Sequence, residues 1–234
     1  MSYPAKGNDR MLPYWKYEGN KIRRWWAKFT PTPFLQRRHF ALAIAAFLCL
    51  LALAAPVAAG QLEDERDAES RSDWATALKL LRPLAEEGNA VAQGQLGLFY
   101  EEGRGVPVDY SEAAKWLRKS ADQGNAISQT NLANLYGLGR GVPLDYAESL
   151  KWLRKSATQR FYGAFVNLGH VYRHGDGVQI DFVQAYMWYR LASDSATTHV
   201  SVRQTADRYL AYLGSKMTRE QIAEAERRAR DWKP

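Results

Sequence analysis

Residues 89–124 read NAVAQGQLGLFYEEGRGVPVDYSEAAKWLRKSADQG, and residues 125–160 read NAISQTNLANLYGLGRGVPLDYAESLKWLRKSATQR. The two segments align without a gap at an offset of 36 residues and are identical at 21 of 36 positions. A sequence period of roughly 20–50 residues is typical of proteins built by stacking small supersecondary units. The sequence therefore predicts a repeat protein whose hydrophobic core continues from one unit to the next.

Each unit has the pattern of two helices joined by a turn. In the second unit, Asn125 can cap a helix over 126–138, in which Leu132, Leu135 and Tyr136 recur at helical spacing. This spacing places the three side chains on one face of the helix, and that face is expected to enter the core.

The turn between the two helices contains Gly139 and Gly141, which can adopt backbone conformations that other residues avoid. Asp145 and Glu148 follow with the spacing of a capping box, and the second helix is expected to end near Gln159. The pattern predicts an all-α fold, a superhelix (solenoid) of stacked helical hairpins.

Weaker copies of the unit lie on either side of the two close copies. In the third copy Arg160-Phe161 replaces the Gly124-Asn125 pair, so this copy is divergent. After it, Thr218 and Gln221 have the spacing of a capping box that opens a last, C-terminal capping helix. The predicted organisation is a basic leader at 1–39, a hydrophobic segment at 40–59, a half repeat at 60–88, repeats at 89–124, 125–160 and 161–196, and capping helices at 197–234.

The consensus of these copies is A-x-x-Q-x-x-L-(G/A)-x-x-Y-x-x-G-x-G-V-x-x-D-(Y/F)-x-x-A-x-x-W-(L/Y)-x-x-(S/A)-A. It resembles the SEL-one-like repeat (SLR), a relative of the tetratricopeptide repeat, and the resemblance covers most of residues 61–234. It implies a tetratricopeptide-like α-solenoid. The family consists of scaffolds and adaptors that bind other proteins, and several bacterial members are periplasmic regulators.

The segment Phe40–Ala59 contains 20 residues without a charge and follows the basic residues Arg37 and Arg38. It can be the hydrophobic region of a signal peptide cleaved near Ala59, a single transmembrane helix, or a buried helix of a soluble protein. We expect one of the first two, because no repeat follows that could cover it. Both place the repeats outside the cytoplasm, in the periplasm, either soluble after cleavage or anchored in the inner membrane by residues 40–59.

The formal net charge of +7 comes from the first part of the chain. Residues 1–59 contain nine Lys and Arg against two Asp and Glu, whereas residues 60–234 contain 23 of each sign. The repeats are therefore not expected to bind nucleic acid. Membrane contact is expected only through residues 40–59, if they are not cleaved. The single cysteine, Cys49, lies in this segment, so the repeats are expected to be stabilised by helix packing alone.

The sequence offers little that resembles a catalytic or metal site. His170 and His174 share a helix face, but Val171 stands where a metalloprotease helix has glutamate, and no third ligand is evident. Gly103 and Gly105 are not followed by the residues of a phosphate-binding loop, and no Gly-x-Ser-x-Gly or Cys-His arrangement occurs. We therefore expect no enzyme activity, no cofactor and no metal.

The first helix of each unit also has a face opposite its core residues, and amides recur there. Side-chain amides offer both a donor and an acceptor, so they can hold an extended peptide backbone. Asn131, Asn134, Asn167 and His170 form the predicted peptide-contacting row, although the same pattern fits a solvated helix face.

The sequence thus favours an exported scaffold that binds another protein or peptide through its concave face. It would act as an adaptor or regulator at the cell envelope, for example on the outer domain of a membrane sensor. One alternative is a module that binds cell wall or oligosaccharide through the same face. A more remote alternative is a hydrolase of cell-wall or β-lactam compounds.

Overall fold

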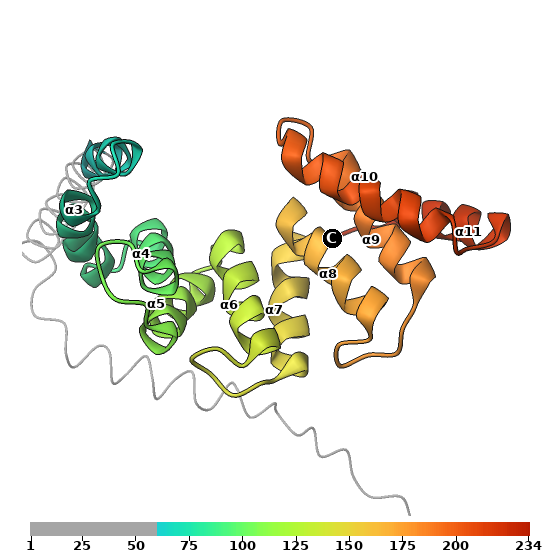
Figure 1. Ribbon diagram of the computed structural model, residues 1–234, viewed down its shortest axis with the longest axis horizontal. Helices are drawn as coiled ribbons and strands as arrows, with labels where there is room; N and C mark the ends of the chain where they lie inside the picture. Colours follow the sequence, from blue (N-terminus) through green and yellow to red (C-terminus); the bar gives the residue numbers. More distant parts are fainter. Residues whose placement is uncertain (1–59) are drawn as a thin grey trace, which may run out of the picture. The chain divides into compact units, whose positions relative to one another are not determined.

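In the computed structural model, which describes residues 60–234, the 36-residue period becomes a series of helical hairpins (Figure 1). A helical segment at 60–70 precedes them, and the described residues contain helices and turns but no strand. The helices are α3 (Trp74–Glu86), α4 (Ala90–Glu102), α5 (Tyr110–Asp122), α6 (Ala126–Leu138), α7 (Tyr146–Thr158), α8 (Tyr162–His174), α9 (Phe182–Ser195), α10 (Val200–Gly214) and α11 (Arg219–Asp231). The predicted all-α solenoid of stacked hairpins is confirmed.

The hairpin α6–α7 shows how the local sequence fixes the helix ends. The Asn125 side chain accepts a hydrogen bond from the backbone N–H of Ser128 at 2.9 Å, which caps α6. Gly139 ends the helix with φ 64°, in the left-handed region that favours glycine. Asp145 then caps α7 by accepting from the Glu148 N–H at 2.9 Å.

The capping box predicted at Asp145 and Glu148 forms only on the aspartate side. The Glu148 side chain accepts hydrogen bonds from Lys151 Nζ and Trp152 Nε1, both at 2.9 Å. It is therefore engaged along the helix and does not reach back to the cap. By contrast, the predicted capping box of Thr218 and Gln221 is complete.

The divergent third hairpin keeps the backbone path of the others with different residues. Arg160 adopts φ 59°, where the equivalent Gly124 has φ 94°. Phe161 occupies the position before α8 and makes no capping hydrogen bond, but it packs against the hydrophobic core. Core contact thus replaces the side-chain cap at this helix.

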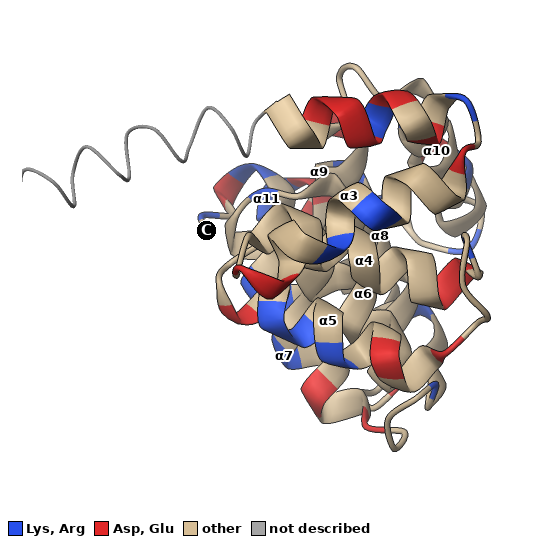
Figure 2. Ribbon diagram, turned by 90° about the vertical axis from the view of Figure 1, so that its left-hand side faces the viewer, with Lys and Arg blue, Asp and Glu red and all other residues tan. Residues whose placement is uncertain are grey.

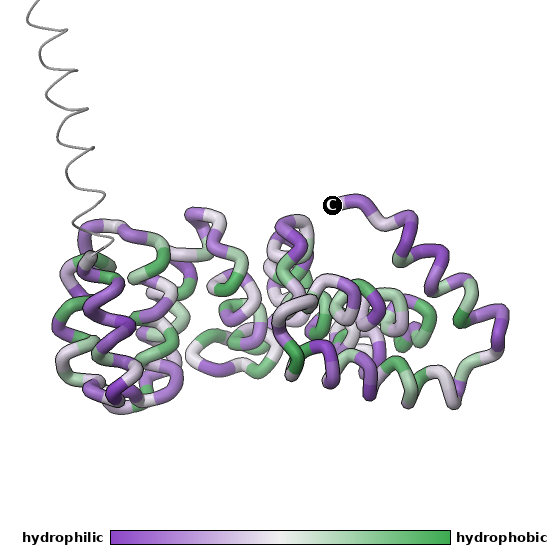
Figure 3. The backbone as a smooth tube through the Cα atoms, turned by 90° about the horizontal axis from the view of Figure 1, so that it is seen from above, coloured by the Kyte–Doolittle hydropathy of each residue, from purple (hydrophilic) through white to green (hydrophobic). Residues whose placement is uncertain are grey.

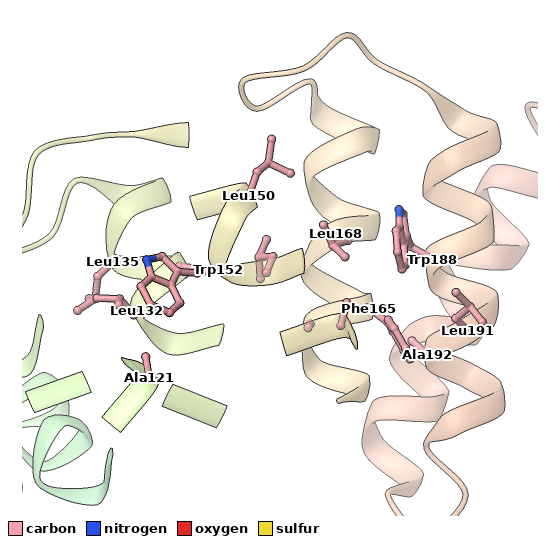
Figure 4. Packing of buried hydrophobic residues seen from close by; sticks show 14 of the residues in the cluster. Ala121, Leu132, Leu135, Leu150, Trp152, Phe165, Leu168, Trp188, Leu191 and Ala192 are labelled. Carbon is pink, nitrogen blue, oxygen red and sulfur yellow. The ribbon is translucent and has the colours of Figure 1, made fainter. Parts of the chain in front are cut away.

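The hydrophobic core runs from hairpin to hairpin. Leu132, Leu135 and Trp152 of α6 and α7 lie in the same buried cluster as Phe165 of α8 and Trp188 of α9 (Figure 4). The cluster extends to Ala206 of α10 and Ala229 of α11. Because each hairpin covers its neighbours, burial of this apolar surface stabilises the stack as a unit.

Glutamine side chains form hydrogen bonds both between consecutive hairpins and within them. Gln129 Nε2 donates to the backbone carbonyl of Ala121 at 3.1 Å, and Gln159 Nε2 donates to Gln129 Oε1 at 2.9 Å. The same pattern occurs 36 residues earlier, where Gln93 Nε2 donates to Ala85 O at 3.0 Å. Phe165 replaces glutamine at the next position and packs against Trp232, so the polar series ends where the C-terminal cap begins.

The C-terminal cap consists of α10 and α11, both of which pack against α9. The first capping helix, α10, begins at Val200, after an irregular segment at 196–199. In α11, Ala225 and Ala229 are buried, and most other positions are hydrophilic (Figure 3). A helix with one apolar stripe and a polar outer face is suited to end a solenoid.

Candidate functional site

In the view of Figure 2, Lys and Arg positions lie close together on α5 and α7, and Asp and Glu positions are scattered over several helices. A hollow of about 290 Å³ lies along the first helices of the hairpins. We call it the hollow throughout. Its lining comes from α4, α6, α7, α8 and the loop after α8, and consists of Glu101, Ala133, Asn134, Gly137, Leu138, Tyr146, Ser149, Leu153, Asn167, His170, Val171 and Asp176.

Three of the four residues predicted to contact a peptide line the hollow. These are Asn134, Asn167 and His170, whereas Asn131 lies outside the lining. Asn167 Nδ2 donates a hydrogen bond to Asn134 Oδ1 at 2.8 Å, so the two amides form a pair across α6 and α8. We call them the amide pair. Asn134 Nδ2 and Asn167 Oδ1 make no hydrogen bond with another described residue, so the first can donate to a ligand and the second can accept from it.

His170 is held in an aromatic environment at the C-terminal side of the hollow. Its Nδ1 lies 3.2 Å from the hydroxyl of Tyr189, and its ring meets the ring of Tyr209 edge to face at 4.8 Å between centroids. Burial, and then the positive charge of Arg173, lowers the pKa of His170 to about 4. The imidazole is therefore neutral near pH 7 and acts as a hydrogen-bonding wall of the hollow.

The two histidines of α8 do not form a metal site with a third residue. The rings of His170 and His174 lie 6.4 Å apart between centroids. Among residues 60–234, no group of three or more His, Cys, Asp or Glu side chains is arranged to hold a metal ion.

Two residues of the hollow could not be recognised as site residues from helix faces alone. Gly137 provides its space, because a Cβ there would lie 3.3 Å from Ser149 Oγ. Glu101 of α4 lines the hollow with a buried Oε2 that has no hydrogen-bond partner among the described residues. Glu101, Gly137 and Arg173 occupy the same position in three successive units. This change of residue type at one repeat position is the signal in the sequence that could have identified them.

The edge of the hollow exposes apolar surface. Leu138, at the end of α6, is 60% exposed, and Tyr146, at the start of α7, is 37% exposed. Large side chains that line a hollow and remain exposed are a common feature of protein-binding surfaces. The hollow therefore combines an apolar edge, an amide pair and acidic side chains.

Comparisons with known proteins agree with this architecture. Residues 90–125, 126–161 and 166–196 match the family model of the Sel1 repeat. The chain is similar to the crystal structure of a protective antigen present in uropathogenic Escherichia coli strains, which displays an SLR fold. The sequence identity is 31% and the TM-score 0.59, over 66% of this chain and 32% of that one. The chain thus spans about a third of that antigen's length.

A second similar structure is that of a Sel1 repeat protein from Oxalobacter formigenes. The two chains are 25% identical with a TM-score of 0.58, over 73% of this chain and 70% of that one. No curated protein matches the chain significantly. Sel1 repeat proteins are typically non-catalytic scaffolds for protein interaction. Residues 90–196 of this chain thus contain three Sel1 repeats, and their stacked hairpins have the fold of these SLR proteins.

Proposed function

We propose that this protein is an adaptor or regulator at the cell envelope, and that its hollow binds an extended segment of a partner protein. The observation that carries the proposal is the amide pair of Asn134 and Asn167, which lines the hollow. An extended backbone presents an N–H and a C=O that no internal hydrogen bond satisfies. The donor and acceptor that the amide pair leaves free match these two groups.

The size and rigidity of the hollow support a peptide segment as the ligand. About 290 Å³ is enough for one or two side chains, while the rest of a segment would lie along the helices. Gln129 connects its hairpin to the preceding one through a hydrogen bond and accepts another from Gln159, so the surface is already formed before binding. A preformed surface loses little conformational entropy on association, which favours affinity.

The location at the envelope rests on residues 40–59, whose sequence predicts a signal peptide or a membrane anchor. This segment and the basic leader at 1–39 lie outside the described residues. Within residues 60–234, no helix has both the length and the hydropathy to cross a bilayer. A partner at the envelope, such as the outer domain of a membrane sensor, fits repeats carried across the inner membrane.

Site-directed photo-crosslinking of the full-length chain in cells tests the proposal. A benzophenone amino acid replaces Leu138, whose side chain is exposed at the edge of the hollow. We expect a discrete protein adduct that disappears when Asn134 and Asn167 are both changed to alanine. Removing both amides avoids leaving one of them unpaired. The matched control is Asn131→Ala, on the same helix as Asn134 but outside the hollow, which should keep the adduct.

Three results would contradict the proposal. One is the absence of a protein adduct, and another is an adduct that persists in the double alanine variant. The third is crosslinking to wall glycan alone, which would favour the oligosaccharide-binding alternative.

A further inference from the structure

The charged residues that line the hollow are all acidic. Glu101 reaches it from α4, and Asp176 reaches it from the loop after α8. Neither carboxylate makes an ion pair with a Lys or Arg of the described residues, although eight such pairs occur elsewhere among these residues. His170, which also lines the hollow, carries no positive charge near pH 7 because burial lowers its pKa to about 4.

Glu101 is the less satisfied of the two acids. Its Oε2 is buried without a hydrogen-bond partner, and burial raises the pKa of its carboxyl. Arg140 is close enough to lower that pKa in part, but its guanidinium stacks over the ring of Tyr110 at 5.3 Å. A buried carboxylate oxygen without a donor is costly, so a ligand that supplies N–H groups to it gains free energy.

We propose that the hollow receives a lysine or arginine side chain of the partner's extended segment, and that Glu101 and Asp176 bind its cationic group. This inference rests on the proposed function and specifies its ligand. The space left by Gly137 admits the side chain. The long aliphatic part of lysine or arginine lies against Leu138 and Tyr146, and its charged end reaches the acids.

The two carboxylates explain why the hollow would prefer a cationic side chain. A charge-assisted hydrogen bond to a carboxylate is stronger than a neutral one, and it is stronger again where water is partly excluded. An acidic side chain in the same position would face two like charges, and an aliphatic one would leave Glu101 Oε2 without a donor. The hollow therefore discriminates by charge as well as by shape.

A displayed library of random decapeptides, selected against the full-length chain in detergent micelles, tests this inference. We expect the selected peptides to share Lys or Arg at one fixed position. The Glu101→Gln/Asp176→Asn variant should lose this preference and bind a selected peptide about tenfold more weakly or worse, as expected for charge-assisted hydrogen bonds. The control is Glu102→Gln, because Glu102 neighbours Glu101 but pairs with Arg104 and lies outside the hollow.

The outcomes separate this inference from the function on which it rests. Peptides whose binding needs Asn134 and Asn167 but shows no preference for a basic residue would refute the inference and leave peptide binding standing. A basic preference that survives loss of both acids would also refute it. Failure to select any peptide that depends on the amide pair would count against the proposed function itself. Circular dichroism of each variant, which should match that of the wild type, shows that the helices remain folded.

Discussion

Replacement of Gly141 by alanine tests whether the hairpins stack as the structure shows. Gly141 lies in the turn between α6 and α7 with φ 68°. A Cβ at this position would lie 2.1 Å from the carbonyl oxygen of Tyr110 and 2.6 Å from the N–H nitrogen of Ser111, at the start of α5. Both atoms belong to the backbone of the preceding hairpin, so alanine would require one hairpin to move away from the other.

Gly124 provides a matched reference for the size of the effect. It also has a positive φ, 94°, but a Cβ there would meet nothing within 4 Å. Alanine at either position is strained in the left-handed conformation, at a cost of about 1–2 kcal/mol. The effect of alanine on the unfolded chain is the same in both variants and cancels in the comparison. The close approach at Gly141 adds a cost of overpacking, about 1–3 kcal/mol or more.

We therefore expect Gly141→Ala to lower the free energy of unfolding by at least about 1–3 kcal/mol more than Gly124→Ala does. For a protein of this size, the extra loss should lower the melting temperature by roughly 2–4 °C for each kcal/mol. Urea and thermal unfolding of the purified full-length variants, followed by circular dichroism at 222 nm, measure the difference. If Gly141→Ala were no less stable than Gly124→Ala, the close approach of the Gly141 turn to the preceding hairpin would be refuted.

A buried residue, Glu65, and a partly buried one, His170, should give opposite pH dependences. Glu65 is fully buried, its Oε2 accepts from Gln95 Nε2 at 3.0 Å, and burial raises its pKa to about 7. Protonated Glu65 stabilises the fold below pH 4.5, and this stabilisation is lost as pH rises through 7. Glu65→Gln should therefore remove up to about 3 kcal/mol of the pH-dependent decline in the free energy of unfolding. The pKa of His170 is lowered to about 4, so stability should fall as pH decreases from about 6.5 to 4, and His170→Gln should remove that fall. Urea midpoints of both variants and the wild type between pH 4 and 8 measure these slopes, and variants that parallel the wild type would contradict the burial of these side chains.

The sequence was sufficient to predict the elements whose causes are local. Leu132 and Leu135, expected in the core from helical spacing, are fully buried. Gly139 has the positive φ expected of a glycine that ends a helix, and Asp145 caps the following helix. These features depend on a few adjacent residues, and the second copy of the unit repeats nearly all of them.

Features that depend on neighbouring hairpins were harder to predict. Helix geometry alone placed Asn131 and Asn134 on the same outer face, but the approach of α8 selects Asn134 for the hollow. Glu148 has the spacing of a capping box, but the side chains of Lys151 and Trp152 compete successfully for its carboxylate. In each case a tertiary or side-chain contact decided between options that the local sequence leaves equal.

Positions that are identical in the repeats and positions that differ between them have different roles in the structure. Positions that are identical in the first two repeats, such as Gln93 and Gln129, form the contacts that connect one hairpin to the next. By contrast, all four α6 residues that line the hollow differ from their counterparts 36 residues earlier. They are Ala133, Asn134, Gly137 and Leu138, and their counterparts are Gly97, Leu98, Glu101 and Glu102. The shared positions form contacts between hairpins, and the variable positions line the hollow. Ala133 is buried in the core, but Asn134, Gly137 and Leu138 are not buried. Because stacking constrains these three positions less, they can change to suit a ligand without destabilising the solenoid.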